Sequence, residues 1–238
     1  MSRFESADVN SFDATSNDGL KKFKFDANFK YRIGFPYLKD TPDGKKLNIA
    51  RVGYFPFNES LKKSFLVTTD AETNEKARKI MGDVKYRFVT PIIVYKTDSA
   101  GKLASPASYD IVPFVFSNDT LKSLQDINLE WNLAEADVYV RIKDGTKVDF
   151  QNLTFTVCKE ALWSKGKNSE DIMGKAVAIS ENMYTAVAID ATPVQVAQWL
   201  GFNNETTDDS DDNTGSSSSS SSADVDAGVS DEDLDGWV

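Results

Sequence analysis

Through the first two thirds of the chain, apolar residues recur mainly at every second position, a period that predicts β-strands with one buried face. In FKYRIGFPYL, apolar residues alternate with Lys30 and Arg32. We expect Phe29, Ile33 and Phe35 to lie in the core. LNIARVGYFPF, VKYRFVTPIIVYK and SYDIVPFVF predict further strands, and TPDGKK predicts a turn.

A late hairpin is predicted in ADVYVRIKDGTKVDFQNLTFTV, where Asp144-Gly145 is a favoured two-residue turn. Its first strand has two faces of different composition, with Val138, Val140 and Ile142 on one and Tyr139, Arg141 and Lys143 on the other. On its second strand, Cys158 shares a face with two threonines, which is typical of an ordinary strand cysteine.

Short helices are expected between the strands. Thr69 and Glu72 have capping-box spacing before AETNEKARKIM, which ends at Gly82. Thr192 and the proline after it begin PVQVAQWL, which Gly201 closes. A further helix follows Asn118-Asp119, with Leu121, Leu124, Ile127 and Trp131 on its buried side.

Together these elements predict a β-rich core, barrel-like or α+β, with short helices. Residues 1–18 lack periodicity and are expected to form a flexible N-terminal arm. Residues 19–202 are expected to form the folded core. Residues 203–238 are rich in serine and acids and cannot bury a core, so we expect a disordered tail.

The composition argues against most enzymes and against a metal site. The chain has no histidine and one cysteine, Cys158, so it lacks the commonest general base, a disulfide framework and Cys/His metal spacing. No nucleotide-binding or hydrolase motif is present. We therefore expect no catalytic residues, no enzyme activity and no cofactor. No apolar run reaches the roughly 20 residues of a membrane span, and a cytosolic protein without a membrane partner is expected.

Charge is distributed unevenly along the chain. The net charge is −10, but residues 203–238 contain eleven acids and no Lys or Arg. The remaining 202 residues hold 27 basic and 26 acidic residues. Within them, residues 19–63 have eleven basic residues against four acids, together with nine aromatic residues. The sequence therefore combines a locally basic body with an acidic tail.

Interleaved cations and aromatic rings suit single-stranded nucleic acid, because Lys and Arg can follow the phosphates while rings stack on unpaired bases. The candidate phosphate contacts are Lys21, Lys22, Lys24, Lys30, Arg32, Lys45, Lys46, Arg51, Lys85, Arg87, Arg141 and Lys143. The candidate stacking residues are Tyr31, Tyr37, Tyr54, Tyr86 and Tyr139. The same alternation also describes any half-buried strand with its rings inside, so both readings stay open here.

The order of four segments resembles the single-stranded DNA-binding (helix-destabilising) proteins of tailed phages, best known from T-even phages. These segments are FKYRIGFPYL, VTPIIVYKTDSAGK, DVYVRIKDGTKVDFQNLTFTV and SSSSSSSADVDAGVSDEDLDGWV. The resemblance implies a core containing an OB-fold whose groove holds single-stranded DNA without sequence preference. It implies a role in replication, recombination and repair, in the cytoplasm of an infected bacterial host. It also implies that the acidic tail regulates DNA access and recruits replication proteins such as a polymerase, a helicase or its loader.

Two features of that family are not carried over. The T-even type holds a structural zinc with Cys and His, and this chain has no histidine and a single cysteine. That family also self-associates on DNA through a basic N-terminal motif. Here the first residues offer only Arg3 among Glu5 and Asp8, so self-association on DNA is possible but is not expected by that route.

The end of the tail combines acids with apolar residues. Asp231, Glu232, Asp233 and Asp235 resemble a short phosphate string, and we expect them to occupy the basic groove when DNA is absent. Leu234, Trp237 and Val238 are expected to anchor in a partner protein. The alternatives to a DNA-binding protein are a virion-structural or protein-interaction module whose tail only solubilises it, and an RNA-binding regulator.

Overall fold

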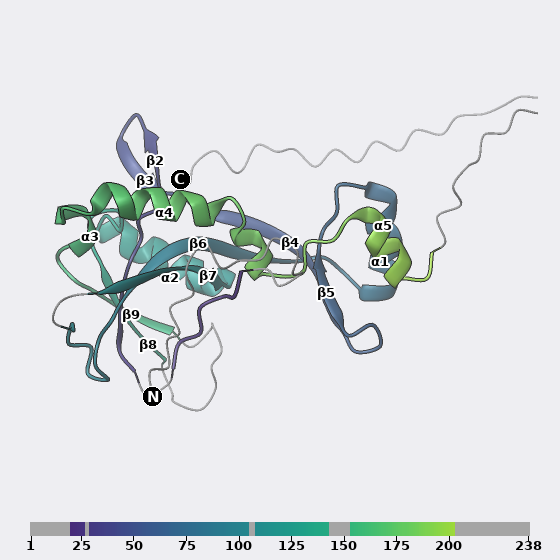
Figure 1. Cartoon of the computed structure of the whole chain (residues 1–238), viewed down its shortest axis with the longest axis horizontal. Helices are drawn as coiled ribbons and strands as arrows, with labels where there is room; N and C mark the ends of the chain where they lie inside the picture. Colours follow the sequence, from purple (N-terminus) through teal and green to yellow (C-terminus); the bar gives the residue numbers. More distant parts are fainter. Residues whose placement is uncertain (1–19, 27–28, 105–107, 143–152, 203–238) are drawn as a thin grey trace, which may run out of the picture.

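The structure, a computed structural model, describes residues 20–26, 29–104, 108–142 and 153–202. They form a mostly antiparallel sheet, a separate two-stranded hairpin and several short helices (Figure 1). The strands are β1 (Tyr31–Gly34), β2 (Leu38–Thr41), β3 (Gly44–Leu47), β4 (Ala50–Asn58), β5 (Lys63–Leu66), β6 (Lys85–Tyr95), β7 (Tyr109–Phe116), β8 (Val138–Ile142) and β9 (Leu153–Val157). The helices are α1 (Ala71–Met81), α2 (Asn118–Glu130), α3 (Leu162–Lys165), α4 (Ser169–Ser180), η3 (Met183–Ala186) and α5 (Pro193–Trp199).

Strand β6 is the centre of the sheet, whose order is β5-β4-β6-β1-β8-β9 with β7 on the other edge of β6. β7 pairs with β6 from Phe88 to Tyr95. The opposite edge is divided, because β4 pairs with Lys85–Val89 and β1 pairs with Ile93–Tyr95. Every residue of β6 from Val89 to Tyr95 is buried, as expected of a central strand covered on both faces.

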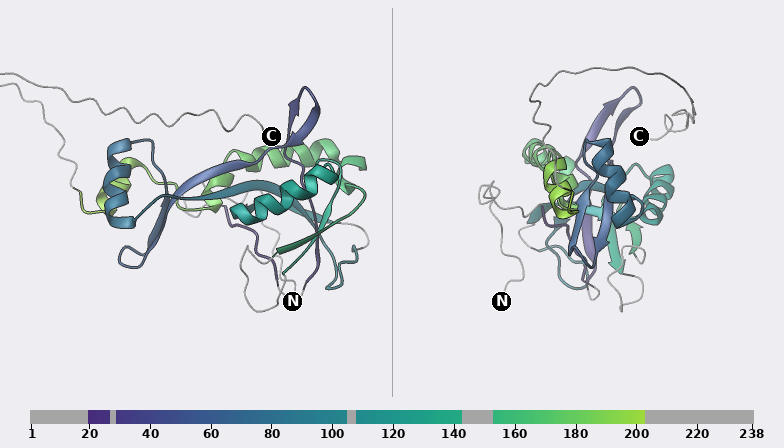
Figure 2. Two further views of the ribbon diagram at one scale, coloured as in Figure 1. Left: turned by 180° about the vertical axis from the view of Figure 1, so that it is seen from behind. Right: turned by 90° about the vertical axis from the view of Figure 1, so that its right-hand side faces the viewer.

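Helices cover both faces of the sheet (Figures 1 and 2). One face packs on α2 through a cluster that includes Ile33, Ile92, Phe114 and Leu124. The other face packs on α3, α4 and η3 through Val89 and Ile93 and their neighbours. The body therefore has helices, sheet and helices in three layers.

A smaller lobe projects from the body, and we call it the distal lobe (Figure 2). It is built from the far ends of β4 and β5 together with α1 and α5, around Phe55, Phe65 and Val196. The chain returns to it late, because the backbone at Ile189 bonds to β5 on both sides of Phe65. Lys63 lies over the ring of Trp199 with its Nζ 4.4 Å from the centroid.

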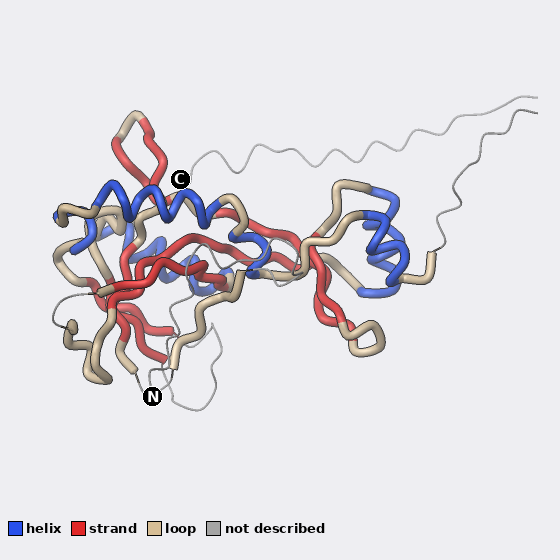
Figure 3. The backbone as a smooth tube through the Cα atoms, viewed as in Figure 1, coloured by secondary structure: helices blue, strands red, loops and turns tan. Residues whose placement is uncertain are grey.

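The small hairpin of β2 and β3 stands away from the sheet (Figure 3). It confirms the predicted TPDGKK turn, since Thr41 pairs with Gly44 across two residues. Gly44 has φ +109°, a value that side chains disfavour, so glycine suits this turn.

The three predicted helices are confirmed, with different caps at two of them. Asp70, not Thr69, caps α1 by accepting a hydrogen bond from the Thr73 amide. Ser117 caps α2 one residue before the predicted signal. Thr192 caps α5 with a full capping box to Gln195, as the sequence predicts. Helices α3 and α4 were not predicted.

The late hairpin is confirmed as an antiparallel pair, but the predicted register is wrong. A two-residue turn at Asp144-Gly145 would place Ile142 opposite Lys147, whereas Ile142 pairs with Leu153. The connecting residues, including the predicted turn, lie outside the described residues, as do the predicted arm (1–18) and tail (203–238).

The coarse fold prediction holds: the described chain is mixed α and β, with a mostly antiparallel sheet and few short helices. The described strand pairings are those of an open path from β5 to β9 and do not by themselves define an OB-type barrel. Phe29, Ile33 and Phe35 belong to the core cluster or pack against it, as expected.

The capping assignments give a direct test of local stability. Replacing Thr192 with Ala removes the side chain that accepts from the Gln195 amide, and we expect it to lower the free energy of unfolding by about 1 kcal/mol. Thr69→Ala is the matched control and should change little, since Asp70 caps α1. Urea denaturation measures both; a larger loss for Thr69→Ala would contradict the assignment.

Candidate nucleic-acid interface

Strands β1 and β8 lie side by side, and their alternation separates an apolar face from a polar one. Arg32 pairs with Tyr139, and Tyr31 pairs with Val140. Val138, Val140 and Ile142 are buried in the core, while Arg141 is exposed and Tyr139 is partly exposed. The structure thus confirms the predicted division of this strand. We call Lys30, Arg32, Tyr139 and Arg141 the β1–β8 face.

Tyr139 lies at the centre of the β1–β8 face. The Nζ of Lys30 lies 3.8 Å from its ring centroid, and the guanidinium carbon of Arg32 lies 6.0 Å away. Neither Lys30 nor Arg141 forms an ion pair with any carboxylate in the part of the chain that the structure describes. The face therefore carries positive charge beside an accessible ring.

Threonines and the cysteine extend this face onto β9. Arg141 pairs with Thr154 and Tyr139 pairs with Thr156, and both threonines are exposed. Cys158 follows directly, and its amide donates to the Asp137 carbonyl. Burial raises the pKa of the Cys158 thiol. Its environment agrees with the expectation of an ordinary strand cysteine.

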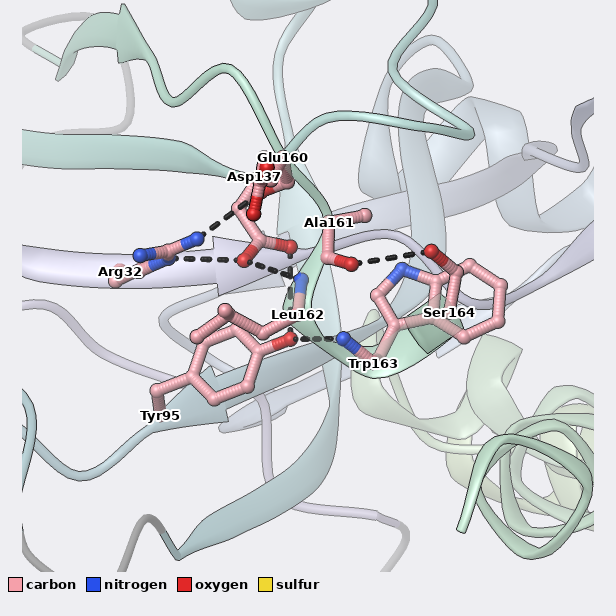
Figure 4. Close-up of polar contacts among 8 residues, drawn as sticks. All are labelled: Arg32, Tyr95, Asp137, Glu160, Ala161, Leu162, Trp163 and Ser164. Atoms are coloured by element: carbon pink, nitrogen blue, oxygen red, sulfur yellow. Dashed lines mark hydrogen bonds and ion pairs between the residues drawn. The ribbon is translucent and has the colours of Figure 1, made fainter. Parts of the chain in front are cut away.

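Arg32 is held by a largely buried network on this same face (Figure 4). Its Nε donates to Asp137 Oδ2 at 2.9 Å, and a second guanidinium nitrogen donates to the Glu160 carbonyl at 3.0 Å. The Asp137 side chain is fully buried, whereas 11% of the Arg32 side chain is exposed. Arg32 is one of the candidate phosphate contacts, and the structure shows that its charge is already paired with Asp137.

Two further groups bind Asp137. The Leu162 amide donates to Oδ2 at 3.1 Å, and the Tyr95 hydroxyl lies 3.5 Å from Oδ1. The Trp163 amide donates to the same hydroxyl at 3.0 Å. Asp137 thus joins the start of α3 to strands β1 and β6 (Figure 4).

The pKa of Asp137 is raised to about 6, because burial raises it by more than the hydrogen bonds from the Leu162 amide and Arg32, and the charge of Arg32, lower it. Burial likewise raises the pKa of Tyr95. Gly34 leaves room for this network, since an added Cβ would lie 2.7 Å from Asp137 Oδ1 and 3.0 Å from the Trp163 ring. Substitution of Gly34 would therefore displace the carboxylate or the indole.

The sequence analysis missed Asp137, Tyr95 and Gly34. Asp137 could have been noticed as an acid on the same side of its strand as Tyr139 and Arg141. Its partner could not, because Arg32 is 105 positions away in the chain.

Tyr31 is also corrected. Its exposed fraction is 8%, and the rings of Phe23 and Phe25 pack against it in edge-to-face geometry. Its hydroxyl accepts from the Asp26 amide. Tyr31 is therefore a core residue and does not offer a ring to a base. Tyr37 and Tyr54 are partly buried and pack against the cluster that includes Val52 and Leu66.

The other predicted residues fall in three places. Lys45 and Lys46 lie on β3 of the separate hairpin. Lys21, Lys22 and Lys24 lie on residues 20–26, which bond to β7 at Pro113. Arg51, Lys85, Tyr86 and Arg87 lie where β4 pairs with the start of β6. Lys143 and the tail residues Asp231, Glu232, Asp233, Leu234, Asp235, Trp237 and Val238 lie outside the described residues.

Over the described ranges, no group of three or more acids or cysteines is placed to hold a metal ion. In the same ranges, no helix is long and apolar enough to cross a membrane. A shallow pocket of about 540 Å³ lies between β2–β3 and α3–α4, lined in part by Leu38, Lys45, Trp163 and Glu170.

Comparison with known proteins adds no family: the chain matches no protein-family model, no curated protein and no solved structure. The interface is therefore argued from its own geometry.

The raised pKa of Asp137 predicts a pH dependence of stability. An unfolded aspartate titrates near ~3.9, so between about pH 4 and pH 6 the folded chain binds a proton that the unfolded chain does not. The contribution of Asp137 to the free energy of unfolding should therefore increase as the pH falls through about 6. The substitution Asp137→Asn removes the carboxyl group that binds this proton.

Urea denaturation of both proteins across this pH range measures the effect. We expect the wild type to gain stability relative to Asp137→Asn as the pH falls. Parallel pH profiles would show that Asp137 does not titrate in this window.

Proposed function

We propose that this chain binds single-stranded nucleic acid, in the first place DNA, without sequence preference and without catalysis. The observation that supports this most is Tyr139, a partly exposed ring with the Lys30 Nζ over it at 3.8 Å from its centroid and the exposed Arg141 two residues along the same strand face. Neighbouring cations favour phosphate, and the ring favours an unpaired base.

The chemistry of this face favours a single strand over a duplex. The π-faces of bases in a duplex are covered by stacking, so Tyr139 would have no base to contact there. Stacking tolerates any base, so a contact made through the Tyr139 ring gives no sequence preference. We therefore propose binding that depends on strandedness and salt, and not on sequence.

The finer proposals follow the family resemblance. They are an OB-type organisation of the core and a role in phage DNA replication, recombination and repair in an infected bacterial cell. The acidic tail is proposed to compete with DNA and to recruit replication proteins through Leu234, Trp237 and Val238. Charge supports the competition, since the tail is acidic while Lys30 and Arg141 have no described ion pair.

Removing the Tyr139 ring tests the interface. Tyr139→Ala should weaken binding to oligo-dT by about 1–3 kcal/mol, the usual value of one stacked base. Tyr139→Phe should bind nearly as well, because the ring remains. Fluorescence anisotropy with labelled DNA, RNA and duplex measures affinity and strand preference together.

Lys122→Gln is the matched charge control, since Lys122 is exposed on α2, which covers the opposite face of the sheet. It should change affinity less than Arg141→Gln, which should also reduce the salt dependence by roughly 0.7 in logarithmic slope. Equal effects of the two variants would refute this interface. Tighter binding to RNA than to DNA of the same sequence would favour an RNA-binding regulator.

The tail is tested by truncation after residue 202. A 1–202 chain should bind oligo-dT more tightly than the full chain, most clearly at low salt where the charges of the tail are least screened. Unchanged or weaker binding would exclude competition between tail and DNA.

A further inference from the structure

The neck is the stretch of β4 and β6 between the body and the distal lobe (Figure 1). A second ring and several basic residues lie in this stretch. At Val52 and Arg87 the described sheet consists of β4 and β6 alone. β5 pairs with β4 only from Tyr54 onward, and β7 pairs with β6 only from Phe88 onward. The described sheet is only two strands wide at this point, so a ligand on one face can reach the other face around an edge.

Tyr86 forms an exposed platform on one face of the neck. Its exposed fraction is 47%, and Gly53 lies opposite it on β4. A Cβ on Gly53 would lie 3.2 Å from the Tyr86 ring and 3.2 Å from Val67, so the absence of a side chain lets the ring approach the backbone.

Arg51 stacks on this platform, with its guanidinium carbon 3.9 Å from the Tyr86 ring centroid. A stacked guanidinium keeps the N–H donors at its edge, in the geometry that suits phosphate. Within the described ranges, Arg51 forms no ion pair with a carboxylate. The Tyr86 ring and a guanidinium that can donate hydrogen bonds to phosphate are thus already in contact.

The other face of the neck carries more positive charge. Arg87 shares this face with Val52, and its guanidinium donates to the Tyr86 carbonyl at 3.3 Å. Burial, followed by the charges of Lys24 and Arg87, lowers the pKa of Lys22. Lys24 and Arg87 therefore both lie close enough to Lys22 for their charges to act on it.

We propose that Lys22, Lys24, Arg51, Tyr86 and Arg87, the neck patch, form a second subsite for the same nucleic-acid strand that the β1–β8 face binds. The cations hold phosphates, and a base stacks on the pair that Arg51 and Tyr86 form. This inference rests on the proposed function and adds to it a bipartite site.

The length of β6 sets the separation of the two subsites. Tyr86 lies near its start, and Tyr95, at its end, is two strands from Tyr139. Nine residue steps of ~3.3 Å give roughly 30 Å along the strand. At ~3.4 Å per stacked nucleotide this corresponds to about nine nucleotides, fewer for an extended strand. A strand contacting both subsites wraps the neck, because alternation places Tyr86 and Tyr139 on opposite faces of the sheet.

Oligonucleotide length tests this in the full chain. Oligo-dT of ~4 nucleotides is too short for both subsites, whereas ~20 nucleotides can reach both. Tyr86→Ala should weaken binding of the longer oligomer by about 5- to 150-fold and leave the shorter one unchanged. Arg51→Gln should reduce the salt slope for the longer oligomer alone by about 0.7. Tyr86→Phe should bind as the wild type does.

Trp131→Ala is the matched control, since Trp131, expected on the buried side of the helix, has an exposed fraction of 41% and directly follows the C-terminal end of α2. Cys158 reports on the first subsite, because it is the only cysteine of the chain. The short oligomer should slow its reaction with a maleimide equally in the wild type and in Tyr86→Ala.

The possible results separate the two proposals. If Tyr86→Ala weakens short and long oligomers equally, the site is continuous and the bipartite inference is wrong. If it weakens neither, or no more than Trp131→Ala does, the neck does not contact the strand. In both cases Tyr139→Ala would still test the β1–β8 face on its own. Absence of any oligomer binding would overturn both proposals.

Discussion

A β-strand has only two hydrogen-bonding edges, yet β6 pairs with three strands. One edge is used by β7, and the other is divided between β4 at its start and β1 at its end. The division gives the molecule its form. The β1 end leads to β8, β9 and the helical layers of the body, whereas the β4 end leads to the neck and the distal lobe. The neck patch lies at one end of β6 and the β1–β8 face lies two strands from its other end, so the length of this strand sets their separation.

The buried pair of Arg32 and Asp137 links the β1–β8 face to β6 and to the start of α3. A buried carboxylate is costly unless it is paired and hydrogen-bonded, and Asp137 receives bonds from three elements. The same pairing determines which cations on this face are available to a ligand. Arg32 lies beside Tyr139 with its charge paired to Asp137, whereas Lys30 and Arg141 form no ion pair among the described residues and remain available to solvent or to phosphate.

The distribution of charge along the chain supports the proposed function. Lys30 and Arg141 on the β1–β8 face and Arg51 at the neck form no ion pair among the described residues, and a ring with exposed surface lies beside them in each place. The excess of acid lies in residues 203–238. A chain with this distribution can bind a polyanion at its body while its net charge stays negative, and the acidic segment is a natural competitor for the same cations.

The sequence by itself determined most of the strands, the helices α1, α2 and α5 and the two faces of β8, because alternation and capping are local properties of a few residues. It also placed Tyr139 and Arg141 on one face for the same reason. Only the tertiary structure decided which of the alternating residues were buried or paired by contacts with distant segments. Tyr31 entered the core because Phe23 and Phe25 pack on it, and Arg32 was paired by an acid 105 positions away. The register of β8 with β9 and the neighbours of Tyr86 likewise depend on contacts between distant segments. These contacts decide whether a cation or a ring is available to a ligand, and local pattern cannot encode them.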